Sequence, residues 1–461
     1  MPQKIGWKSL KEAIKKEAPD IIGAGENHAL YAHEVTKLFA MTKDISAHII
    51  TIAGGTHFSA LAQDYIKNQN IDFIVKGEGE ETLKELITEI SKTSPSYKNI
   101  QNIAFKENGN IIETPFRPLI EDLDTLPLPA YDLVPMAEYG KSKYLFSPGG
   151  TTIHHSRGCS SKCKFCAFWV QMADKKEVNG QTISTPKWRT KSVAKTITEI
   201  ELLYNNYQKE CLVFVDESFN ISQNWNQEFA ETLISKPFNI KYFAFMRLDF
   251  ILRDEKAGIF EKMIKSGLSH ICIGVERSKD QDLNNFGKNF YSNQETVECF
   301  EILNSKYPSL FKQATFIIGT KDETKESCLA QVDFAKKLKV DFPAFHPLTP
   351  VPGTELWEEE KKAGNLENLN FQDLDWATPI LPSQYLTRDE ILDLIYIMNK
   401  RFLNFKWLFK GLFSKYTYKR RMYIWWFTVS LRLTLDSLIR FINPLKAKIY
   451  TKLEKPKWYN S

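Results

Sequence analysis

Three cysteines lie within eight residues of one another, directly after a run of residues typical of a β-strand. They are Cys159, Cys163 and Cys166, and they follow the run at 151–155. Thiolates this close together on one loop can bind a single metal centre, whereas one disulfide would leave the third sulfur unpaired. Three ligands suit a four-iron, four-sulfur cluster in which one iron keeps an open coordination position. An open iron can bind a substrate or cofactor and pass an electron to it.

Two other interpretations of these cysteines stay open from the residues alone. His154 or His155 precedes them and could complete a structural zinc site, which needs four ligands. The thiols could also be buried without any metal. The other cysteines are scattered, as is typical of buried packing residues. They are Cys211, Cys272, Cys299 and Cys328.

The spacing C-x3-C-x2-C, with the aromatic Phe165 before the last cysteine, resembles the signature of the radical SAM enzymes. The resemblance implies that the three cysteines bind a [4Fe-4S] cluster and that S-adenosylmethionine (SAM) binds at its open iron, with Phe165 beside the adenine. It further implies that one electron, from a reductant such as flavodoxin or ferredoxin, cleaves SAM. The resulting 5′-deoxyadenosyl radical then takes a hydrogen atom from an unactivated carbon.

Six apolar or β-branched runs follow from residue 151 onward, and all but the last lead into a helical pattern. They predict parallel strands at residues 151–156, 212–216, 242–248, 270–275, 314–319 and 342–348. The expected fold is α/β, with a partial (β/α)6 barrel of the TIM type over residues 149–360. Functional side chains of such barrels gather at the carboxyl ends of the strands.

The residues at these strand ends are the candidates for SAM binding. They are Asp216, Glu217, Arg247, Gly274 and Glu276, and His346 ends the sixth strand. By the resemblance, Asp216 and Glu217 meet the amino group of SAM or the substrate. Arg247 suits the methionine carboxylate, because a guanidinium donates two parallel hydrogen bonds, and Glu276 suits the ribose. For each side chain the alternative is an ordinary salt bridge at a strand end.

The chain before residue 97 predicts a smaller α/β domain, with strands at 20–25, 47–53 and 72–75 and helices at 29–41, 59–67 and 81–90. Two strands end in glycine-bearing loops, where backbone can approach a ligand closely. The runs P-D-I-I-G, A-G-G-T-H-F-S and D-F-I-V-K-G-E-G-E-E resemble the cobalamin-binding domain found in one branch of the radical SAM superfamily. By that resemblance, cobalamin is bordered by Gly54, Gly55, Thr56, His57, Gly77, Glu78, Gly79 and Glu80.

Two departures from that domain's pattern bear on cobalamin. The family domain has a further strand-helix-strand unit ahead of this point, whereas only some eighteen residues precede the first strand here. The motif D-x-H-x-x-G does not occur, so no histidine can be assigned as a lower ligand of cobalt. We therefore expect a truncated Rossmann-like domain over residues 1–96 that binds cobalamin, with a degenerate or partner-completed domain as the alternative.

Residues 97–148 are predicted to be a linker. It contains a hairpin that turns at Asn108-Gly109 and the proline-rich stretch 122–131, which cannot form a regular helix. No chemistry is expected from this segment.

The predicted helical region 361–461 ends in a strongly basic segment, because residues 401–461 hold fourteen Lys and Arg against two acidic residues, among many aromatic side chains. Arg432, Asp436 and Arg440 are four residues apart and would share one face of a helix. Such a helix favours peripheral contact with a membrane. A docked helix with a solvated basic face is the second interpretation, and contact with RNA is the least favoured.

The fullest interpretation is a cobalamin-dependent radical SAM enzyme. Residues 167–171, 186–189 and 375–380 are similar to the anaerobic magnesium-protoporphyrin IX monomethyl ester cyclases. The resemblance therefore implies methyl transfer or oxidative cyclisation on a hydrophobic substrate such as a porphyrin or lipid.

Two competing classes have sequence tests of their own. An RNA-modifying radical SAM enzyme such as a methylthiotransferase would show a second cysteine trio near its N-terminus, which is not seen, and an iron-sulfur electron carrier would not need six strand-helix units. The unpaired cysteines and the absence of an apolar leader after Met1 predict a cytoplasmic protein, which could sit on the inner face of the membrane.

Overall fold

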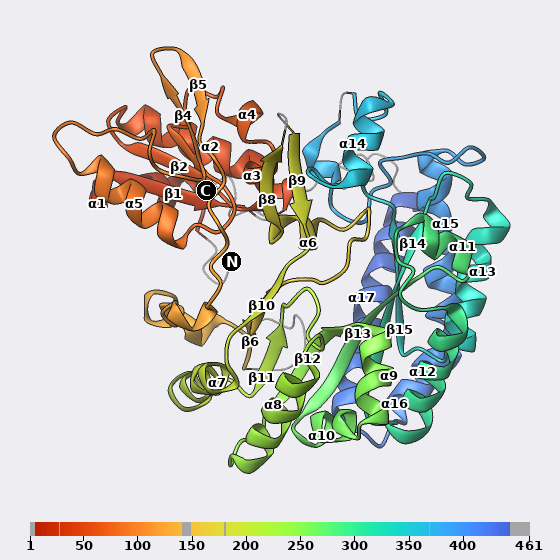
Figure 1. Cartoon of the computed structure of the whole chain (residues 1–461). Helices are drawn as coiled ribbons and strands as arrows, with labels where there is room; N and C mark the ends of the chain where they lie inside the picture. The colour runs from red at the N-terminus through yellow and green to blue at the C-terminus, as the bar shows by residue number, and fades with distance from the viewer. Residues whose placement is uncertain (1–4, 27, 141–148, 179–180, 368, 443–461) are drawn as a thin grey trace.

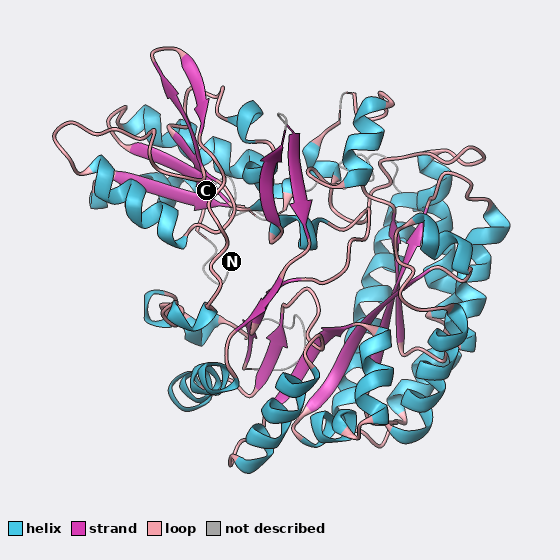
Figure 2. Ribbon diagram, in the orientation of Figure 1, coloured by secondary structure: helices cyan, strands magenta, loops and turns pink. Residues whose placement is uncertain are grey.

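The computed structural model describes residues 5–26, 28–140, 149–178, 181–367 and 369–442. Figure 1 shows an N-terminal α/β domain beside a larger open barrel, with the last helices packed against the barrel. The two domains have separate sheets, which Figure 2 shows in magenta. The predicted α/β fold, with a small domain followed by a six-stranded parallel barrel, is confirmed.

Five strands form the N-terminal sheet, in the order β1-β2-β3-β4-β5. They are β1 (Ile21–Gly25), β2 (Ile50–Gly54), β3 (Phe73–Val75), β4 (Ile103–Glu107) and β5 (Asn110–Glu113). The first three are parallel, as predicted, and β4 and β5 form the expected antiparallel hairpin.

The hairpin corrects the predicted domain boundary. β4 pairs with β3, so the hairpin extends the N-terminal sheet and does not belong to a linker. A boundary at residue 96 divides this sheet, because the local pattern at 97–115 does not reveal which distant strand the hairpin pairs with. In the described part of the remaining connection, which ends at residue 140, the helical elements are the short 3-10 turns η2 (Leu123–Thr125), η3 (Tyr131–Leu133) and η4 (Met136–Glu138).

Helices cover both faces of the N-terminal sheet. Side chains alternate between faces along a strand. Ile74 therefore packs in one core cluster with α2 (Ala32–Ile45) and α3 (Thr56–Ala60), whereas its neighbours Phe73 and Val75 pack in another with α5 (Glu80–Ile90). The domain is completed by α1 (Trp7–Glu17), η1 (Ala29–Tyr31) and α4 (Ala62–Tyr65).

Six parallel strands form the barrel sheet in chain order, from β6 at one edge to β15 at the other. They are β6 (Gly150–Ile153), β11 (Cys211–Phe214), β12 (Lys241–Met246), β13 (Leu268–Glu276), β14 (Phe311–Ile318) and β15 (Phe342–Pro347). These strands match the six predicted runs. β6 and β15 do not pair with each other, so the barrel is open between them.

The barrel helices cover the outside of this sheet, and their start points are encoded locally. Ser192, Ser222, Ser292 and Thr324 each precede a helix, and each side chain accepts a hydrogen bond from the first turn. The helices are α7 (Val193–Tyr207), α8 (Gln223–Ser235), α9 (Leu248–Lys256), α10 (Ile259–Lys265), α11 (Asp280–Asn285), α12 (Asn293–Lys306), α13 (Lys325–Lys337) and α14 (Glu355–Lys362).

An insertion between β6 and α7 carries structure that the sequence pattern did not predict. It contains β7 (Ser156–Gly158), α6 (Ala167–Gln171), β8 (Asp174–Val178), β9 (Gln181–Thr185) and β10 (Trp188–Thr190). β7 pairs with β10, and β8 with β9, both antiparallel. Figure 1 shows the β8–β9 hairpin between the N-terminal domain and α14. The cysteine run lies between β7 and α6.

The C-terminal region forms α15 (Arg388–Phe402), α16 (Phe405–Leu412) and α17 (Thr417–Ile442), after the short turn η5 (Phe371–Asp373). α15 packs on α13 and β15. The first turns of α17 are anchored at Asp341, just before β15. The Asp341 carboxylate accepts a hydrogen bond from the Tyr423 hydroxyl at 2.8 Å and lies 2.9 Å from the Lys419 ammonium. Among the described residues, no helix is both long and apolar enough to cross a bilayer.

This packing supports the docked-helix interpretation for the first half of α17. The charged face predicted at Arg432, Asp436 and Arg440 involves side chains outside those the structure describes.

Candidate functional site

The loop that carries the three cysteines is held by hydrogen bonds of its backbone groups to three other segments. The Gly158 amide donates to Glu217 at 3.0 Å, the Lys164 amide donates to the carbonyl of Phe286 at 3.0 Å, and the Leu356 amide donates to the carbonyl of Lys164 at 3.1 Å. Gly158 has φ +85°, and a Cβ there would overlap a backbone carbonyl of the insertion. Glycine is therefore required where β7 turns into this loop.

The three thiols lie close enough to influence one another, since Cys159 and Cys163 both raise the pKa of Cys166. Burial is the larger effect, and it raises the pKa of Cys163 to about 11 and that of Cys166 to about 12. In the part of the chain that the structure describes, no three His, Cys, Asp or Glu side chains are arranged as a ready-made metal site.

The donor set nevertheless fits an iron-sulfur cluster, because three thiols stand on one short loop. Binding of iron would have to draw the sulfurs together and release their protons.

The zinc alternative finds no support at His155. This side chain is fully buried and stacks on Trp225, with ring centroids 3.8 Å apart. Its Nδ1 and Nε2 lie 3.1 Å from the Thr190 hydroxyl and the Phe219 carbonyl, respectively. Both ring nitrogens are therefore engaged in the barrel core and are not available to a metal.

Asp216 and Glu217 follow β11 and take different positions. Asp216 is buried, and its Oδ1 accepts hydrogen bonds from the amides of His155 and Ser156 at 3.0 and 2.6 Å. It thus supports the corner between β6 and β7. Glu217 binds the Gly158 amide next to the cysteines, and burial raises its pKa to about 7.

Arg247, at the end of β12, reaches the cysteine loop. Its guanidinium forms a two-point pair with Asp249 at 3.0 and 2.6 Å and donates to the hydroxyls of Ser160 and Ser161. Its flat face lies 3.9 Å from the ring centroid of Phe290. These contacts hold a fork-shaped donor beside the two serines that directly follow Cys159.

Glu276, at the end of β13, is paired with a lysine that the sequence analysis missed. Lys288 lies 2.8 Å from Glu276 and donates to the Gly274 carbonyl at 2.7 Å. Burial is the largest single influence and would lower the pKa of Lys288, but the charge and hydrogen bond of Glu276, with Tyr291 and Cys163, together raise it. A Cβ at Gly274 would overlap both charged groups. Lys288 follows Gly287 in the sequence, and nothing in this pair of residues indicated that the lysine would pair with Glu276.

Phe165 and His346 have other partners than these charged groups. The Phe165 ring meets Phe286 edge-on with centroids 5.2 Å apart, and packs on a cluster that includes Ile317 and Leu348 at the ends of the barrel strands. His346 contacts the carbonyl of Trp376 at 3.1 Å. Phe165 therefore lies on the apolar part of the barrel mouth, and His346 is engaged with the C-terminal region.

The first glycine loop of the N-terminal domain comprises Gly54, Gly55, Thr56 and His57. Gly55 has φ +86°, and a Cβ there would overlap the backbone of Glu26. His57 is buried beneath the loop, where its Nε2 lies 2.9 Å from the hydroxyl of Tyr65 and its ring meets Phe371. Burial lowers the pKa of His57 to about 4.

The second glycine loop, Gly77 to Glu80, is joined to the barrel domain by ion pairs. The side chain of Glu78 is 5% exposed and lies 2.6 Å from Arg157 and 2.9 Å from Arg189. Glu80 lies 2.5 Å from Arg157, and although burial would raise the pKa of Glu80, Arg157 lowers it. Arg157 stands on β7, two residues before Cys159, so this contact brings the second glycine loop next to the cysteine loop.

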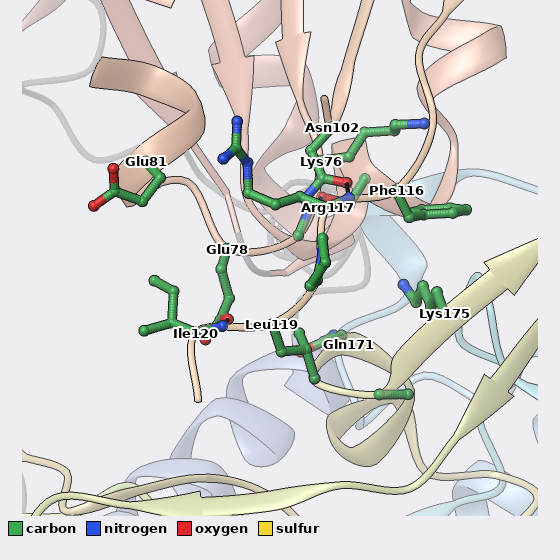
Figure 3. A pocket seen from close by; sticks show the side chains of 14 residues that line it. Lys76, Glu78, Glu81, Asn102, Phe116, Arg117, Leu119, Ile120, Gln171 and Lys175 are labelled. Atoms are coloured by element: carbon green, nitrogen blue, oxygen red, sulfur yellow. Dashed lines mark hydrogen bonds between the residues drawn. The ribbon is translucent and has the colours of Figure 1, made fainter. Parts of the chain in front are cut away.

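A cavity lies beside this loop, between the two domains (Figure 3). Three basic side chains line it, namely Lys76, Arg117 and Lys175. In Figure 3, Lys175 on β8 points toward Phe116, and its Nζ lies 5.7 Å from that ring centroid. Burial, and then the charge of Lys76, lower the pKa of Lys175 to about 8. Lys76 and Arg117 are paired with Glu113 and Glu85, so the cavity next to Glu78 is lined by charges of both signs.

Two family models match the chain: the B12 binding domain over residues 2–87 and the Radical SAM superfamily over residues 153–335. The chain is a radical SAM protein with a B12-binding domain. The first match ends within α5 and contains both glycine loops. The second extends from the end of β6 into α13 and contains the three cysteines.

Relatives of this radical SAM protein agree with that assignment. An uncharacterized methyltransferase of Pyrococcus horikoshii is 29% identical over 422 residues, which cover 90% of this chain and 85% of that protein. The anaerobic magnesium-protoporphyrin IX monomethyl ester cyclase of Rubrivivax gelatinosus is 27% identical, over 88% of this chain and 70% of the cyclase. The predicted similarity to this group of cyclases is confirmed.

Solved structures share the fold. The radical SAM methyltransferase TsrM from Kitasatospora setae superposes with a TM-score of 0.62 and 16% identity, over 78% of this chain and 68% of TsrM. The cobalamin-dependent radical SAM enzyme OxsB gives 0.58 and 19% identity, over 79% of this chain and 49% of OxsB. Both have structures with cobalamin bound. The cofactors of this radical SAM protein are accordingly a [4Fe-4S] cluster, SAM and cobalamin.

Proposed function

We propose that this protein is an enzyme that cleaves SAM reductively and functionalises an unactivated carbon of a small hydrophobic substrate, by methyl transfer or oxidative cyclisation. The observation that carries the proposal is the contact of Glu78 and Glu80 with Arg157. It brings a loop of the B12-binding domain to within two residues of Cys159. Chemistry that uses both cofactors on one substrate needs such proximity.

We assign the cluster to Cys159, Cys163 and Cys166. Arg247 is proposed to bind the carboxylate of SAM, because its fork already lies beside the cysteine loop, and Glu217 its amino group. Glu276, positioned by Lys288, is assigned to the ribose, and Phe165 to the adenine. Gly274 leaves room for the Glu276–Lys288 pair. Asp216 is proposed to act indirectly, by holding the β6–β7 corner.

For cobalamin, we propose that the backbones of Gly54, Gly55, Thr56, Gly77 and Gly79 approach the cofactor. His57, Glu78 and Glu80 would then shape the loops, since their side chains are already engaged with Tyr65, Arg157 and Arg189.

When bound, the cluster with SAM supplies a 5′-deoxyadenosyl radical, and cobalamin supplies a methyl group or an electron. The protein's own part is positional. Arg247 and the Glu276–Lys288 pair present fixed charges at the barrel mouth. Phe165 and its cluster exclude water from one side of the site. Fixed donors of this kind orient a bound cofactor without further reorganisation.

The remaining features of the proposal concern partners and location. We propose a porphyrin-like or lipid-like substrate, a flavodoxin or ferredoxin as reductant, and a cytoplasmic protein that contacts the membrane through residues 401–461. The names of the cyclase relatives support a porphyrin-like substrate, and the basic, aromatic composition of the C-terminal region supports the membrane contact.

The test is anaerobic incubation of the reconstituted protein with SAM and a strong reductant, followed by assay of 5′-deoxyadenosine. Cys163→Ser should abolish both the iron-sulfur absorbance and the product, whereas Cys211→Ser, a buried cysteine on β11, should change neither. A fully cluster-loaded protein that forms no 5′-deoxyadenosine would contradict the enzyme and leave an electron carrier. Retention of corrinoid absorbance after desalting tests the cobalamin part separately.

A further inference from the structure

The outer face of α16 and Phe413, the residue directly after this helix, form an exposed row of phenylalanines. Phe405, Phe409 and Phe413 are four residues apart and 78%, 56% and 80% exposed. The rings of Phe409 and Phe413 are stacked in parallel, with centroids 6.1 Å apart. Single exposed apolar residues are ordinary on a protein surface, but an aligned aromatic row marks an interaction site.

The inner face of the same helix is fixed to the barrel domain. Asn404 caps the helix by accepting from the Trp407 amide at 3.1 Å. The Trp407 indole donates to the Asp341 carbonyl at 2.6 Å, and its ring lies 4.7 Å from that of Tyr423. A Cβ at Gly411 would overlap Tyr423, so α16 lies directly against α17. The phenylalanine row therefore cannot turn inward and is presented to the outside.

The charged side chains of the segment that carries the row have one sign. Lys406 and Lys410 are exposed on α16 itself, and Lys415, Arg420 and Arg421 are exposed just after it. No Asp or Glu occurs in the sequence between Asp393 and Asp436. The surface therefore combines apolar rings with positive charge and has no acidic residue of its own segment to neutralise it.

We propose that this surface, which we call the α16 face, binds an anionic phospholipid bilayer, with the three phenylalanine rings inserted between the headgroups. Rings and lysines on one short helix match the apolar boundary and the negative headgroups of such a surface. A helix of eight residues is about 12 Å long and can lie only in the interface.

A second copy of the chain fits the α16 face less well. A symmetric dimer through this face would bring the same lysines and arginines of both copies together. The inference deepens the proposed membrane contact by naming its surface and its lipid, and it moves the contact from Arg432 and Arg440 to α16.

The test is co-sedimentation of the full-length protein with vesicles of phosphatidylcholine containing about a quarter phosphatidylserine, at low and high salt. The triple variant Phe405→Ser, Phe409→Ser, Phe413→Ser should bind these vesicles at least about tenfold more weakly. Leu133→Ser, which alters an 80% exposed side chain in the linker, is the matched control and should bind like the unaltered protein.

A charge variant keeps the test valid if the triple variant folds poorly. Lys406→Glu with Lys415→Glu should weaken binding about tenfold or more at low salt and little at high salt. Binding unchanged in both variants would overturn the inference. So would a dimer, seen by analytical ultracentrifugation, that the triple variant dissolves, because the α16 face would then be an interface between two copies.

The catalytic proposal is tested apart from this one. 5′-Deoxyadenosine formation without vesicles should be the same in all these variants, because α16 packs at Asp341, before the first residue of β15 and at the opposite end from the cysteine loop. A protein that binds vesicles but forms no 5′-deoxyadenosine would refute only the proposed enzyme, and the reverse result would refute only the membrane contact.

Discussion

The ion pairs of Glu78 give the sharpest prediction, because the resemblance and the structure assign this residue different tasks. If Glu78 only contacts cobalamin, replacing it should not change the stability of the protein without cobalamin. An ion pair between the two domains stabilises the protein whether or not cobalamin is present. The decisive substitution is therefore Glu78→Ala, studied in protein without cobalamin.

The magnitude follows from the groups that the substitution leaves behind. The Glu78 carboxylate accepts hydrogen bonds from Arg157, Arg189 and the Ile120 amide. Without it, Arg157 keeps Glu80, but Arg189, whose side chain is 3% exposed, keeps only the Ile120 carbonyl. The Nε and Nη2 atoms of Arg189 already have no partner. Removing one partner of a buried pair costs about 3 to 5 kcal/mol, and we expect the lower end because Arg157 stays paired.

The assay is thermal unfolding followed by circular dichroism, with Glu81→Ala as the matched control, because Glu81 is the exposed neighbour on the same turn. Glu78→Ala should lower the melting temperature by about 3 °C or more. The double variant Glu78→Leu, Arg189→Met should recover most of this loss, because an apolar pair replaces a buried charge without a partner. A melting temperature equal to that of Glu81→Ala would refute the reasoning and return Glu78 to the set of cobalamin contacts.

Three further outcomes are expected. Gly274→Ala should displace the Glu276–Lys288 pair, destabilise the protein by about 1 to 3 kcal/mol and abolish 5′-deoxyadenosine formation, whereas Gly23→Ala, where a Cβ has room, should do neither. Arg247→Lys should raise the KM for SAM about tenfold or more with a smaller change in kcat, because an ammonium cannot replace the fork held by Asp249; an unchanged KM would exclude Arg247 from SAM binding. The lowered pKa of His57 means that the unfolded chain takes up a proton at this residue below about pH 6.5 and the folded chain only near pH 4, so His57 should contribute a loss of about 3 kcal/mol of stability across that window. Burial also lowers the pKa of His154, His155 and His270, so His57→Gln should reduce the slope in denaturant titrations by the share of His57, whereas exposed His48→Gln should leave the slope unchanged.

Local sequence was sufficient for the elements whose physics is local. The six barrel strands, the Asn108-Gly109 hairpin and the cysteine loop were all predicted within a few residues, because periodicity, turn chemistry and thiol spacing act over short distances. The serine and threonine caps of the barrel helices belong to the same class. The family of the protein could also be predicted from the sequence, because its motifs are contiguous runs of residues.

Contacts between distant residues were not predictable in this way. Pairing of the hairpin with β3 moved the domain boundary, and the insertion after β6 contains two antiparallel pairs that no pattern indicated. Lys288 was missed because it is twelve residues from Glu276 in the sequence. The two side chains meet only because the intervening chain folds back on the end of β13.

The sequence alone thus determined which groups are able to do chemistry here. They are three thiols, the backbone of two glycine loops and a set of charged side chains at strand ends. Tertiary structure decided which of those charged side chains form ion pairs between the two domains. Glu78 meets Arg157 and Arg189 across 79 and 111 residues. The charge and aromatic content of residues 401–427 likewise did not reveal that Tyr423 is buried while Phe405 and Phe413 are exposed. The physical reason is that burial and ion pairing depend on which surfaces meet, and that is settled only when the two domains and the last helices have packed.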